Sequence, residues 1–477
     1  MADSVAVDSA LLGAVAEGED WEAVLFDAAC RSAQENAGEL LHRLDAVLAE
    51  RRPPGLKKWM RQRRTVLTRF GPVTVKRWVY REQATGRRRQ LLDECLGWGK
   101  RRAVSPSLAR LLAVLDSEMP YRQAAQLLGE LVPQSVSKNT AQRLIVELGQ
   151  RQQSKEQVQA DALRDGAAPP AARSVQRLFV EADGLMVPLQ REARRRTEIK
   201  AAVAYRGTRK IGVDRHGRER RETLGTVSFT GRGPGEPFWE QAWGQFGQHY
   251  QLEAIEQVVL GGDGADWIRG ALELVGPDQQ GVFQLDRFHL ARALRGALGP
   301  DAGPAVQALR SEQLAVVRAC LDQALADTPA GNRRRAIQGV LGYLVANADG
   351  LLRWTTQLGV PAQGEPRLGS METHIDKLLA NRLKKKGMSW SIPGLLAMGK
   401  ARQLRANGQL SSDLFRHCPL PPTPRRDRRH APARVLPTCA PRRQPPFQAS
   451  LAPRWGPHSS RPWVQALIRL TRGPALE

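Results

Sequence analysis

Two aspartates in this chain of 477 residues each stand beside a glycine at the end of an apolar run. Asp183 ends the run in LFVEADG, and Asp263 ends the run in VVLGGDGA. Short apolar runs of this kind predict buried strands, and glycine at their ends lets backbone and ligand approach closely. Most Asp-Gly pairs are simply turns, so a functional site here requires that other acids converge on these two.

The chemistry open to converging carboxylates is metal-dependent phosphoryl transfer. Carboxylates held close together repel one another unless a cation neutralises them. Mg²⁺ binds one or two carboxylates together with phosphate oxygens, and two ions about 3.5–4 Å apart clamp the attacking and leaving oxygens. We therefore expect two Mg²⁺ (or Mn²⁺) ions. The second ion needs a third acid: Glu372 is the candidate, and Asp376, one helical turn later, is the alternative.

The elements that would position these acids form a mixed α/β fold. Three runs within residues 175–231 predict strands joined by hairpins, and strands alternate with helices after them. In a meander followed by a crossover, the first and fourth strands can be neighbours, which would bring Asp183 and Asp263 to adjacent strand ends. Apolar residues recur at helical spacing in residues 301–365 and predict an all-helical insertion ahead of the helix that carries Glu372.

Charge is unevenly distributed along the chain. The sequence holds 72 Lys+Arg and 48 Asp+Glu, a net charge of +24. Residues 1–50 hold two Arg against eleven acids, whereas residues 51–110 hold eighteen Lys+Arg against three acids. Blocks of this kind favour a polyanionic partner, and double-stranded DNA is the partner that we expect.

The basic N-terminal region contains two patterns typical of DNA-binding proteins. The stretch TVLTRFGPVTVKRWVYR predicts a β-hairpin whose Lys76 and Arg77 are candidates for phosphate contacts; a merely solvated basic hairpin is the alternative. Residues 117–149 predict a helix-turn-helix, with ordinary helical packing as the alternative. The residues near the start of its second helix, where such motifs meet base edges, are Lys138, Asn139, Gln142 and Arg143.

The last sixty residues differ in composition from the rest of the chain. They hold eleven Arg against two acids and are rich in proline, so they cannot build a hydrophobic core. They are either a disordered basic arm or an out-of-frame translation that begins near His417, and the second interpretation is the one we favour.

Composition also limits the compartment. No two of the five cysteines have CxxC spacing, which supports neither a zinc ribbon nor a disulfide framework. No run of about eighteen apolar residues predicts a membrane span, and the acidic N-terminus lacks the basic start of a secretory signal. We expect a cytoplasmic, nucleoid-associated bacterial protein.

Four stretches of the sequence resemble insertion-sequence transposases of the ISLre type. They are VEADGLMVPLQREARRRTEIKAAVAYRG, GGDGADWIRGA, FQLDRFHLARAL and GSMETHIDKLLANRLKKKGMSWS, and the resemblance extends over about residues 20–415. The resemblance implies a ribonuclease-H-like catalytic domain with a DDE triad. Carried over to this sequence, the triad and its metal ligands would be Asp183, Asp263 and Glu372.

The stretch LDRFHL also resembles the Asp/Cys-x-x-His signature of related transposases, which implies that Asp286 and His289 lie near the site. For His289 we expect a role in positioning DNA or in a hydrogen bond to a site acid rather than in metal binding; a structural histidine that caps the next helix is the alternative. The basic residues after the third acid that we expect to hold the DNA backbone are Arg382, Lys384 and Lys385.

The sequence therefore predicts a multidomain α/β protein. Its expected parts are an N-terminal helical segment (1–60), a β-hairpin and helix-turn-helix DNA-binding region (61–150), a linker (151–173), the first part of a ribonuclease-H-like core (174–300), the helical insertion (301–365), the final core helix (366–416) and the tail (417–477). The expected function is that of a DNA transposase that acts as a homo-oligomer on element ends and target DNA. The alternatives are a catalytically inactive DNA-binding remnant with a frame-shifted C-terminus and a structure-specific nuclease on the same fold.

Overall fold

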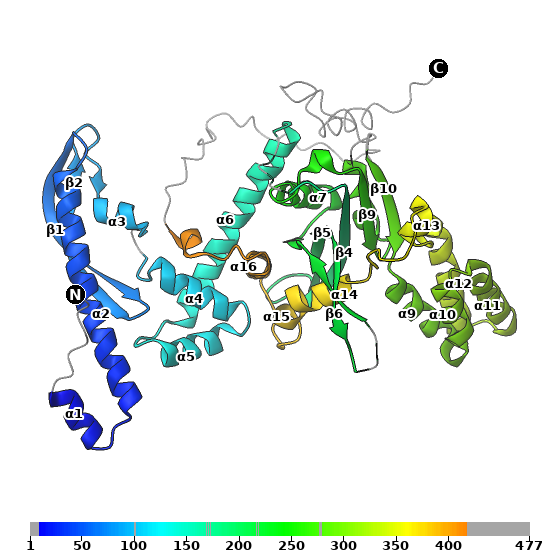
Figure 1. Cartoon of the computed structure of the whole chain (residues 1–477), viewed down its shortest axis with the longest axis horizontal. Coiled ribbons are helices and arrows are strands. Elements are labelled where there is room, and N and C mark those ends of the chain that lie inside the picture. The colour runs from blue at the N-terminus through cyan, green and yellow to red at the C-terminus, as the bar shows by residue number, and fades with distance from the viewer. Residues whose placement is uncertain are drawn as a thin grey trace. The chain divides into compact units, whose positions relative to one another are not determined.

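The computed structural model describes residues 9–416, apart from 100–101, 168, 170, 172, 216, 218 and 276–278 (Figure 1). These residues divide into two compact units, one formed by residues 9–148 with 409–416 and the other by residues 149–408. The expected tail, from His417 onward, lies outside the described residues.

The first unit opens with helices and a long β-ribbon. Its elements are α1 (Ser9–Ala16), α2 (Trp21–Glu50), β1 (Leu56–Thr68), β2 (Gly71–Glu82), β3 (Arg88–Arg89) and α3 (Leu91–Leu96). The strands are antiparallel and take the order β1-β2-β3. The turn between β1 and β2 uses Gly71 at φ +114°, which L side chains rarely adopt. The Asp45 carboxylate on α2 accepts the backbone N–H of Trp78, which ties this helix to β2.

A helical group completes the first unit. It contains α4 (Pro106–Asp116), α5 (Tyr121–Leu131), the start of α6 (Lys138–Arg164) and the 3-10 turn η6 (Ser412–Phe415), which packs on α4. Helices α5 and α6 occupy the stretch expected to be a helix-turn-helix. Helix α6 continues unbroken to Arg164, so the first part of the expected linker 151–173 is helical.

The second unit is built on a five-stranded mixed sheet. Its strands are β4 (Arg177–Pro188), β5 (Arg196–Tyr205), β8 (Val227–Gly231), β9 (Gln257–Gly262) and β10 (Gln280–Leu285), in the order β10-β9-β4-β5-β8. Strands β4, β9 and β10 are parallel to one another, and β5 is antiparallel to β4 and β8. Strand β4, which carries Asp183, and strand β9, which directly precedes Asp263, are therefore neighbours, as expected. Asp183 was expected at the end of its strand, but it lies within β4, which continues to Pro188 in its pairing with β5.

A separate hairpin stands between β5 and β8 in the chain. It consists of β6 (Gly207–Val213) and β7 (Glu219–Leu224), which pair only with each other. The sequence pattern predicts one strand across ETLGTVSFTG, but the structure divides this stretch between β7 and β8. The break lies at Gly225, whose φ of +69° does not fit a strand.

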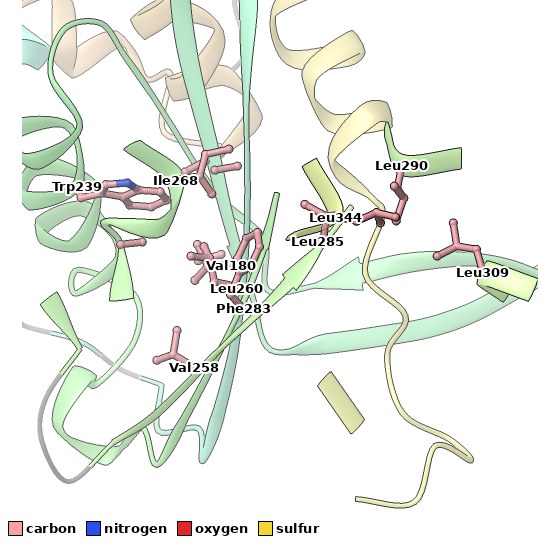
Figure 2. Close-up of a cluster of buried hydrophobic side chains, with 14 of the residues drawn as sticks. Val180, Trp239, Val258, Leu260, Ile268, Phe283, Leu285, Leu290, Leu309 and Leu344 are labelled. Atoms are coloured by element: carbon pink, nitrogen blue, oxygen red, sulfur yellow. The ribbon is translucent and has the colours of Figure 1, made fainter. Parts of the chain in front are cut away.

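Helices pack on both faces of the sheet. Trp239 and Ile268 lie on one face against Val180, Leu260 and Phe283, which are aligned on three neighbouring strands (Figure 2). On the opposite face, Trp354 packs against Phe179, Tyr205 and Val259. The larger helices are α7 (Gly235–Phe246), α9 (Arg287–Leu298), α10 (Ala302–Arg310), α11 (Leu314–Asp327), α12 (Asn332–Ala346) and α16 (Ile392–Ala406).

Short helical segments connect these elements. They are η1 (Leu252–Ala254), α8 (Asp266–Arg269), η2 (Leu272–Leu274), η3 (Gly299–Asp301), η4 (Ala348–Gly350), α13 (Trp354–Leu358), α14 (Met371–Ile375), the π turn η5 (Asp376–Ala380) and α15 (Asn381–Leu383). Residues 302–358 contain helices and no strand, as the sequence predicts for the insertion. Within the described part of the chain, no helix is both long enough and apolar enough to cross a membrane.

Candidate metal centre

Three aspartates lie at one level of the sheet: Asp263 and Asp286 directly follow β9 and β10, whereas Asp183 lies within β4, which continues to Pro188. Strands β4 and β9 are aligned at Glu181 and Gly261, two residues before Asp183 and Asp263. The N–H of Asp286 donates to the carbonyl of the last residue of β9 at 2.7 Å, which extends the alignment to β10. Strands β9 and β10 therefore end beside the part of β4 that carries Asp183, which brings the three acids to one edge of the parallel part of the sheet.

Three side chains from separate elements converge at this edge into a group that can hold a metal ion. Asp183 comes from β4, His289 from α9 and Glu372 from α14, and one ligand atom of each lies within 4.8 Å of the others. Asp183 and His289 are half-buried, and Glu372 is exposed. Two carboxylate oxygens and one imidazole nitrogen suit Mn²⁺ as well as Mg²⁺, because imidazole is a better ligand for transition metals.

Asp263 lies beside this group and is not a member of it. Its Oδ1 accepts the N–H of Ala265 at 3.0 Å, and its negative charge contributes to a raised pKa of Asp183. The hydroxyl of Tyr343, on α12, donates to the main-chain carbonyl of Asp263 at 2.5 Å. The helical block between α9 and α13 therefore contacts the backbone at the strand end that carries this acid.

Asp286 both begins α9 and orients His289. Its Oδ1 accepts the N–H of Phe288 at 2.8 Å, which caps the helix, and its Oδ2 lies 2.9 Å from Nδ1 of His289. With Nδ1 donating to Asp286, the nitrogen that His289 can offer to an ion is Nε2. The hydrogen bond and charge of Asp286 raise the pKa of His289 against the opposing effect of burial.

The environment of Asp183 disfavours the anionic form of its carboxyl. Burial raises the pKa of Asp183 to about 6, and the charges of Asp263 and Glu372 act in the same direction. The N–H of Gly184, which donates to Oδ1 at 2.7 Å, and the nearby His289 oppose this rise. A carboxyl that is unfavourable as a lone anion is stabilised when a cation lies beside it.

Glu372 is carried by a helical run with one wide turn. Helix α14 passes into the π turn η5 and then into α15, and such turns occur frequently at functional sites. Asp376, the alternative third acid, lies in the π turn and pairs with Lys385, with Nζ 2.5 Å from Oδ1. Glu372 is therefore the acid of this run that joins the group.

Most residues expected to contact DNA present their side chains to solvent. Those that are exposed are Lys76, Lys138, Asn139, Gln142, Arg143, Lys384 and Lys385. The four residues on α6 lie one and four positions apart, so they share one side of that helix.

Arg77 and Arg382 require a correction. Arg77 is only 5% exposed, and its Nε and Nη2 both donate to the carboxylate of Asp93 at 2.7 Å. Arg382 is 1% exposed, and its guanidinium lies over the ring of Trp390 at 5.0 Å from the centroid. Both cations are held inside the fold, so neither is presented to a DNA backbone as the sequence pattern suggested.

The structure brings two further residues, Glu181 and Tyr343, to the same edge, and the sequence pattern predicts no role for either. Glu181 is 2% exposed and accepts hydrogen bonds from the segment ahead of Glu372. Its signal in the sequence is an acid inside the apolar run LFVEADG. Tyr343 lies in an amphipathic helical run, where no local pattern marks it as a neighbour of Asp263.

Several known proteins are similar to this chain over most of its length. UPF0236 protein TTE2489 of Caldanaerobacter subterraneus subsp. tengcongensis is 24% identical over 376 residues, which cover 77% of this chain and 74% of that protein. Another protein of that organism, whose name joins eleven UPF0236 locus designations, is 23% identical over 376 residues, or 77% of this chain and 73% of that protein.

A relative from Streptococcus gallolyticus, the UPF0236 protein in the vanSb 3′ region, is 25% identical over 361 residues. The aligned part covers 72% of this chain and 73% of that protein. Residues 19–414 match the family described as "Uncharacterised protein family (UPF0236)". The match covers well over half of the sequence, and the chain therefore belongs to the UPF0236 family.

Proposed function

We propose that this protein is a DNA transposase of a bacterial insertion sequence, with its strand-cleavage site at Asp183, Asp263, His289 and Glu372. The observation that carries the proposal is the convergence of Asp183, His289 and Glu372 from three elements within 4.8 Å. Acids gathered at one sheet edge need a cation, and a DNA strand brings phosphate oxygens that complete the coordination of such a cation.

The topology of the sheet supports a ribonuclease-H-like assignment for the second unit. If β4, β5, β8, β9 and β10 are numbered one to five along the chain, their order across the sheet is 3-2-1-4-5. The second strand, β5, is antiparallel to both of its neighbours. This is the arrangement expected of a ribonuclease-H-like core, in which the first and fourth strands are neighbours. Asp183 lies on the first of these strands and Asp263 directly follows the fourth.

The donor set fits a divalent cation. Asp183 and Glu372 offer carboxylate oxygens, and His289 offers Nε2, held in orientation by Asp286. Asp263 is the adjacent acid available to a second ion. When bound, such cations activate the attacking water or 3′-hydroxyl and neutralise the charge that develops on the phosphate.

The first unit is proposed to bind the ends of the element. The exposed side of α6 offers Lys138, Asn139, Gln142 and Arg143 to DNA. On the β1–β2 ribbon, Lys58 and Arg61 lie over the ring of Trp78, 5.1 and 4.8 Å from its centroid. Lys58 is exposed and Arg61 is partly exposed, and cations beside an aromatic ring suit contact with phosphates and sugars, which fixes the position of a protein on DNA.

The names of the relatives agree with a mobile gene. One relative carries eleven locus designations from a single organism, as a self-copying DNA element would leave behind. The names of relatives therefore support the proposal, but the proposed strand-cleavage activity is argued from the geometry of the acids.

The experiment is a cleavage and joining reaction on DNA that carries the flanking sequences of the gene. It is run with Mg²⁺ or Mn²⁺, with EDTA, and with the Asp263→Ala and Asp183→Asn variants. We expect metal-dependent 3′-ends and joined products that are absent with EDTA and in both variants, while binding to the ends is nearly unchanged. Equal loss of binding and cleavage in both variants contradicts the assignment of these acids. Tight end binding by the wild-type protein without cleavage identifies it instead as an inactive DNA-binding remnant.

A further inference from the structure

A buried acid on β4 lies two residues before Asp183. Glu181 is 2% exposed, and its side chain is on the same face of the sheet as that of Asp183 because alternate residues of a strand share a face. A carboxylate is rarely buried unless its oxygens are hydrogen-bonded. The partners of Glu181 therefore indicate why an acid occupies this position.

The partners come almost entirely from the segment that precedes Glu372. Glu181 accepts the N–H of Gly369 at 2.8 Å, of Ser370 at 3.0 Å and of Met371 at 3.3 Å, all at Oε2. Its Oε1 accepts the hydroxyl of Ser370 at 2.5 Å and the hydroxyl of Tyr205 at 2.6 Å. Three successive backbone N–H groups bound by one carboxylate fix the path of that backbone.

The fixed segment leads directly into the third acid of the proposed site. Met371 is the first residue of α14, and Glu372 is the next. Gly369 has φ +112°, so the turn before α14 uses a backbone conformation that few residues adopt, and the hydrogen bonds to Glu181 hold that turn against β4. Strand β4 thus carries Asp183 on its own backbone and holds the start of the helix that carries Glu372.

We propose that Glu181 is a positioning residue that sets the place of Glu372 relative to Asp183, so that metal binding depends on it without direct contact. The inference rests on the proposed function insofar as the Asp183–His289–Glu372 group binds a divalent cation. Outer partners that orient metal ligands typically change metal affinity by about 10- to 100-fold when they are removed.

The test variant is Glu181→Gln in the full chain. Glutamine keeps the shape of the side chain, but its amide group places a donor where backbone N–H groups now donate, so the 369–371 segment loses part of its hold. Tyr205→Phe is the matched control, because it removes a hydrogen bond to the same carboxylate from outside that segment.

The first measurement is hydrogen–deuterium exchange of the metal-free protein over residues 366–375. We expect Glu181→Gln to raise exchange in this segment by about tenfold or more, while the core strands remain protected and Tyr205→Phe changes the segment little. Unchanged exchange of residues 366–375 in Glu181→Gln overturns the proposal, independently of whether the protein binds metal ions.

The second measurement is a double-mutant cycle on Mn²⁺ affinity. The affinity of each full-length variant is measured by titration with Mn²⁺. Glu181→Gln is expected to weaken Mn²⁺ binding by about tenfold or more, and by less than about twofold when Glu372→Gln is already present, since it acts through that residue. Equal losses in both backgrounds indicate a general structural role and overturn the proposal. If Asp183→Asn binds Mn²⁺ as tightly as wild type, the proposed metal site fails, while the exchange result still decides whether Glu181 holds the segment.

Discussion

Asp286 uses one carboxylate oxygen to cap α9 and the other to bind Nδ1 of His289, at 2.8 Å from the N–H of Phe288 and 2.9 Å from the imidazole. Helix geometry and imidazole orientation therefore depend on a single side chain. Because asparagine caps helices about as well as aspartate, the two roles can be separated by one substitution.

Asp286→Asn is expected to preserve α9 and to weaken Mn²⁺ binding by about 10- to 100-fold, because the anion that orients His289 is lost. Calorimetric titration with Mn²⁺ measures the affinity, and circular dichroism checks the helix content. Asp20→Asn, at the cap of α2 in the first unit, is the control and should bind Mn²⁺ like wild type. Unaltered affinity in Asp286→Asn contradicts the role assigned to His289.

The raised pKa of Asp183 predicts how stability depends on pH. Burial raises this pKa from 3.8 to about 6. A group whose pKa is higher in the folded state favours folding below its unfolded pKa, and that contribution is lost as pH rises through the folded value. The free energy of unfolding of the metal-free protein therefore contains a term that falls between pH 3.8 and about 6.

Asp183→Asn removes this term, which is at most about 3 kcal/mol. In EDTA at pH 8 the variant is expected to be more stable than wild type, and at pH 4 the two should be nearly equal. Thermal unfolding at both pH values measures the difference. Added Mn²⁺ should stabilise only the wild type, because a ligand stabilises the state that binds it. A variant less stable than wild type at pH 8 would refute this account of Asp183.

Lys76 and Arg77 are neighbours on β2, and substitution by alanine is expected to affect DNA binding at Lys76 and stability at Arg77. Lys76 is exposed, so Lys76→Ala should weaken DNA binding and reduce the slope of log affinity against log salt by about 0.9 if it contacts one phosphate. Arg77 is buried on Asp93, which Arg64 also contacts at 2.7 Å. Arg77→Ala removes two hydrogen bonds to Asp93 but leaves Arg64 paired with it, so it should lower the free energy of unfolding by about 1–3 kcal/mol and leave the salt slope unchanged.

Fluorescence anisotropy with labelled DNA at several salt concentrations separates the two effects, beside thermal unfolding of each variant. The anisotropy is measured at a temperature where both variants are folded. A salt slope that falls equally for Lys76→Ala and Arg77→Ala would mean that the ribbon meets DNA differently from this structure.

A buried ion pair joins α6 to α16 within the second unit. Nζ of Lys400 lies 2.6 Å from Oε2 of Glu156, and their side chains are 2% and 0% exposed. Burial lowers the pKa of Lys400, and the charge of Glu156 opposes this effect. Glu156→Gln leaves the buried ammonium without its anion and should lower the free energy of unfolding by about 3–5 kcal/mol.

The double variant Glu156→Gln with Lys400→Met removes the charge that the single variant leaves unpaired. We expect it to recover a large part of the lost stability, because an uncompensated buried charge is more unfavourable than no charge. Urea unfolding of the full chain gives both values. A double variant less stable than Glu156→Gln alone would show that the pair contributes through packing rather than charge.

Much of the second unit follows from local patterns in the sequence. The apolar runs that end near Asp183 and Asp263 predict two strands, and the structure pairs them as neighbours. The helical insertion is predictable because apolar residues repeat at helical spacing over several turns. The sequence does not predict β6–β7 as a separate hairpin, because most of its residues are exposed and show no alternating apolar pattern.

Features that depend on long-range contacts are harder to predict from the sequence. Arg77 is one of many basic residues in its region, and only the fold shows that it pairs with Asp93, sixteen residues away. His289 was expected in a supporting role, whereas the structure brings it into one group with Asp183 and Glu372. Sequence separation does not report which of several nearby acids and imidazoles have side chains that meet.

The spacing of Glu181 and Asp183 on β4 limits how a gene of this kind can change in length. Successive side chains of a strand point to opposite faces, so one codon inserted or deleted between them would turn one acid to the other side of the sheet. The turn before Glu372 and the ligand on β4 would then no longer face each other. Within this short stretch, evolution and protein engineering can exchange residues but cannot add or remove one.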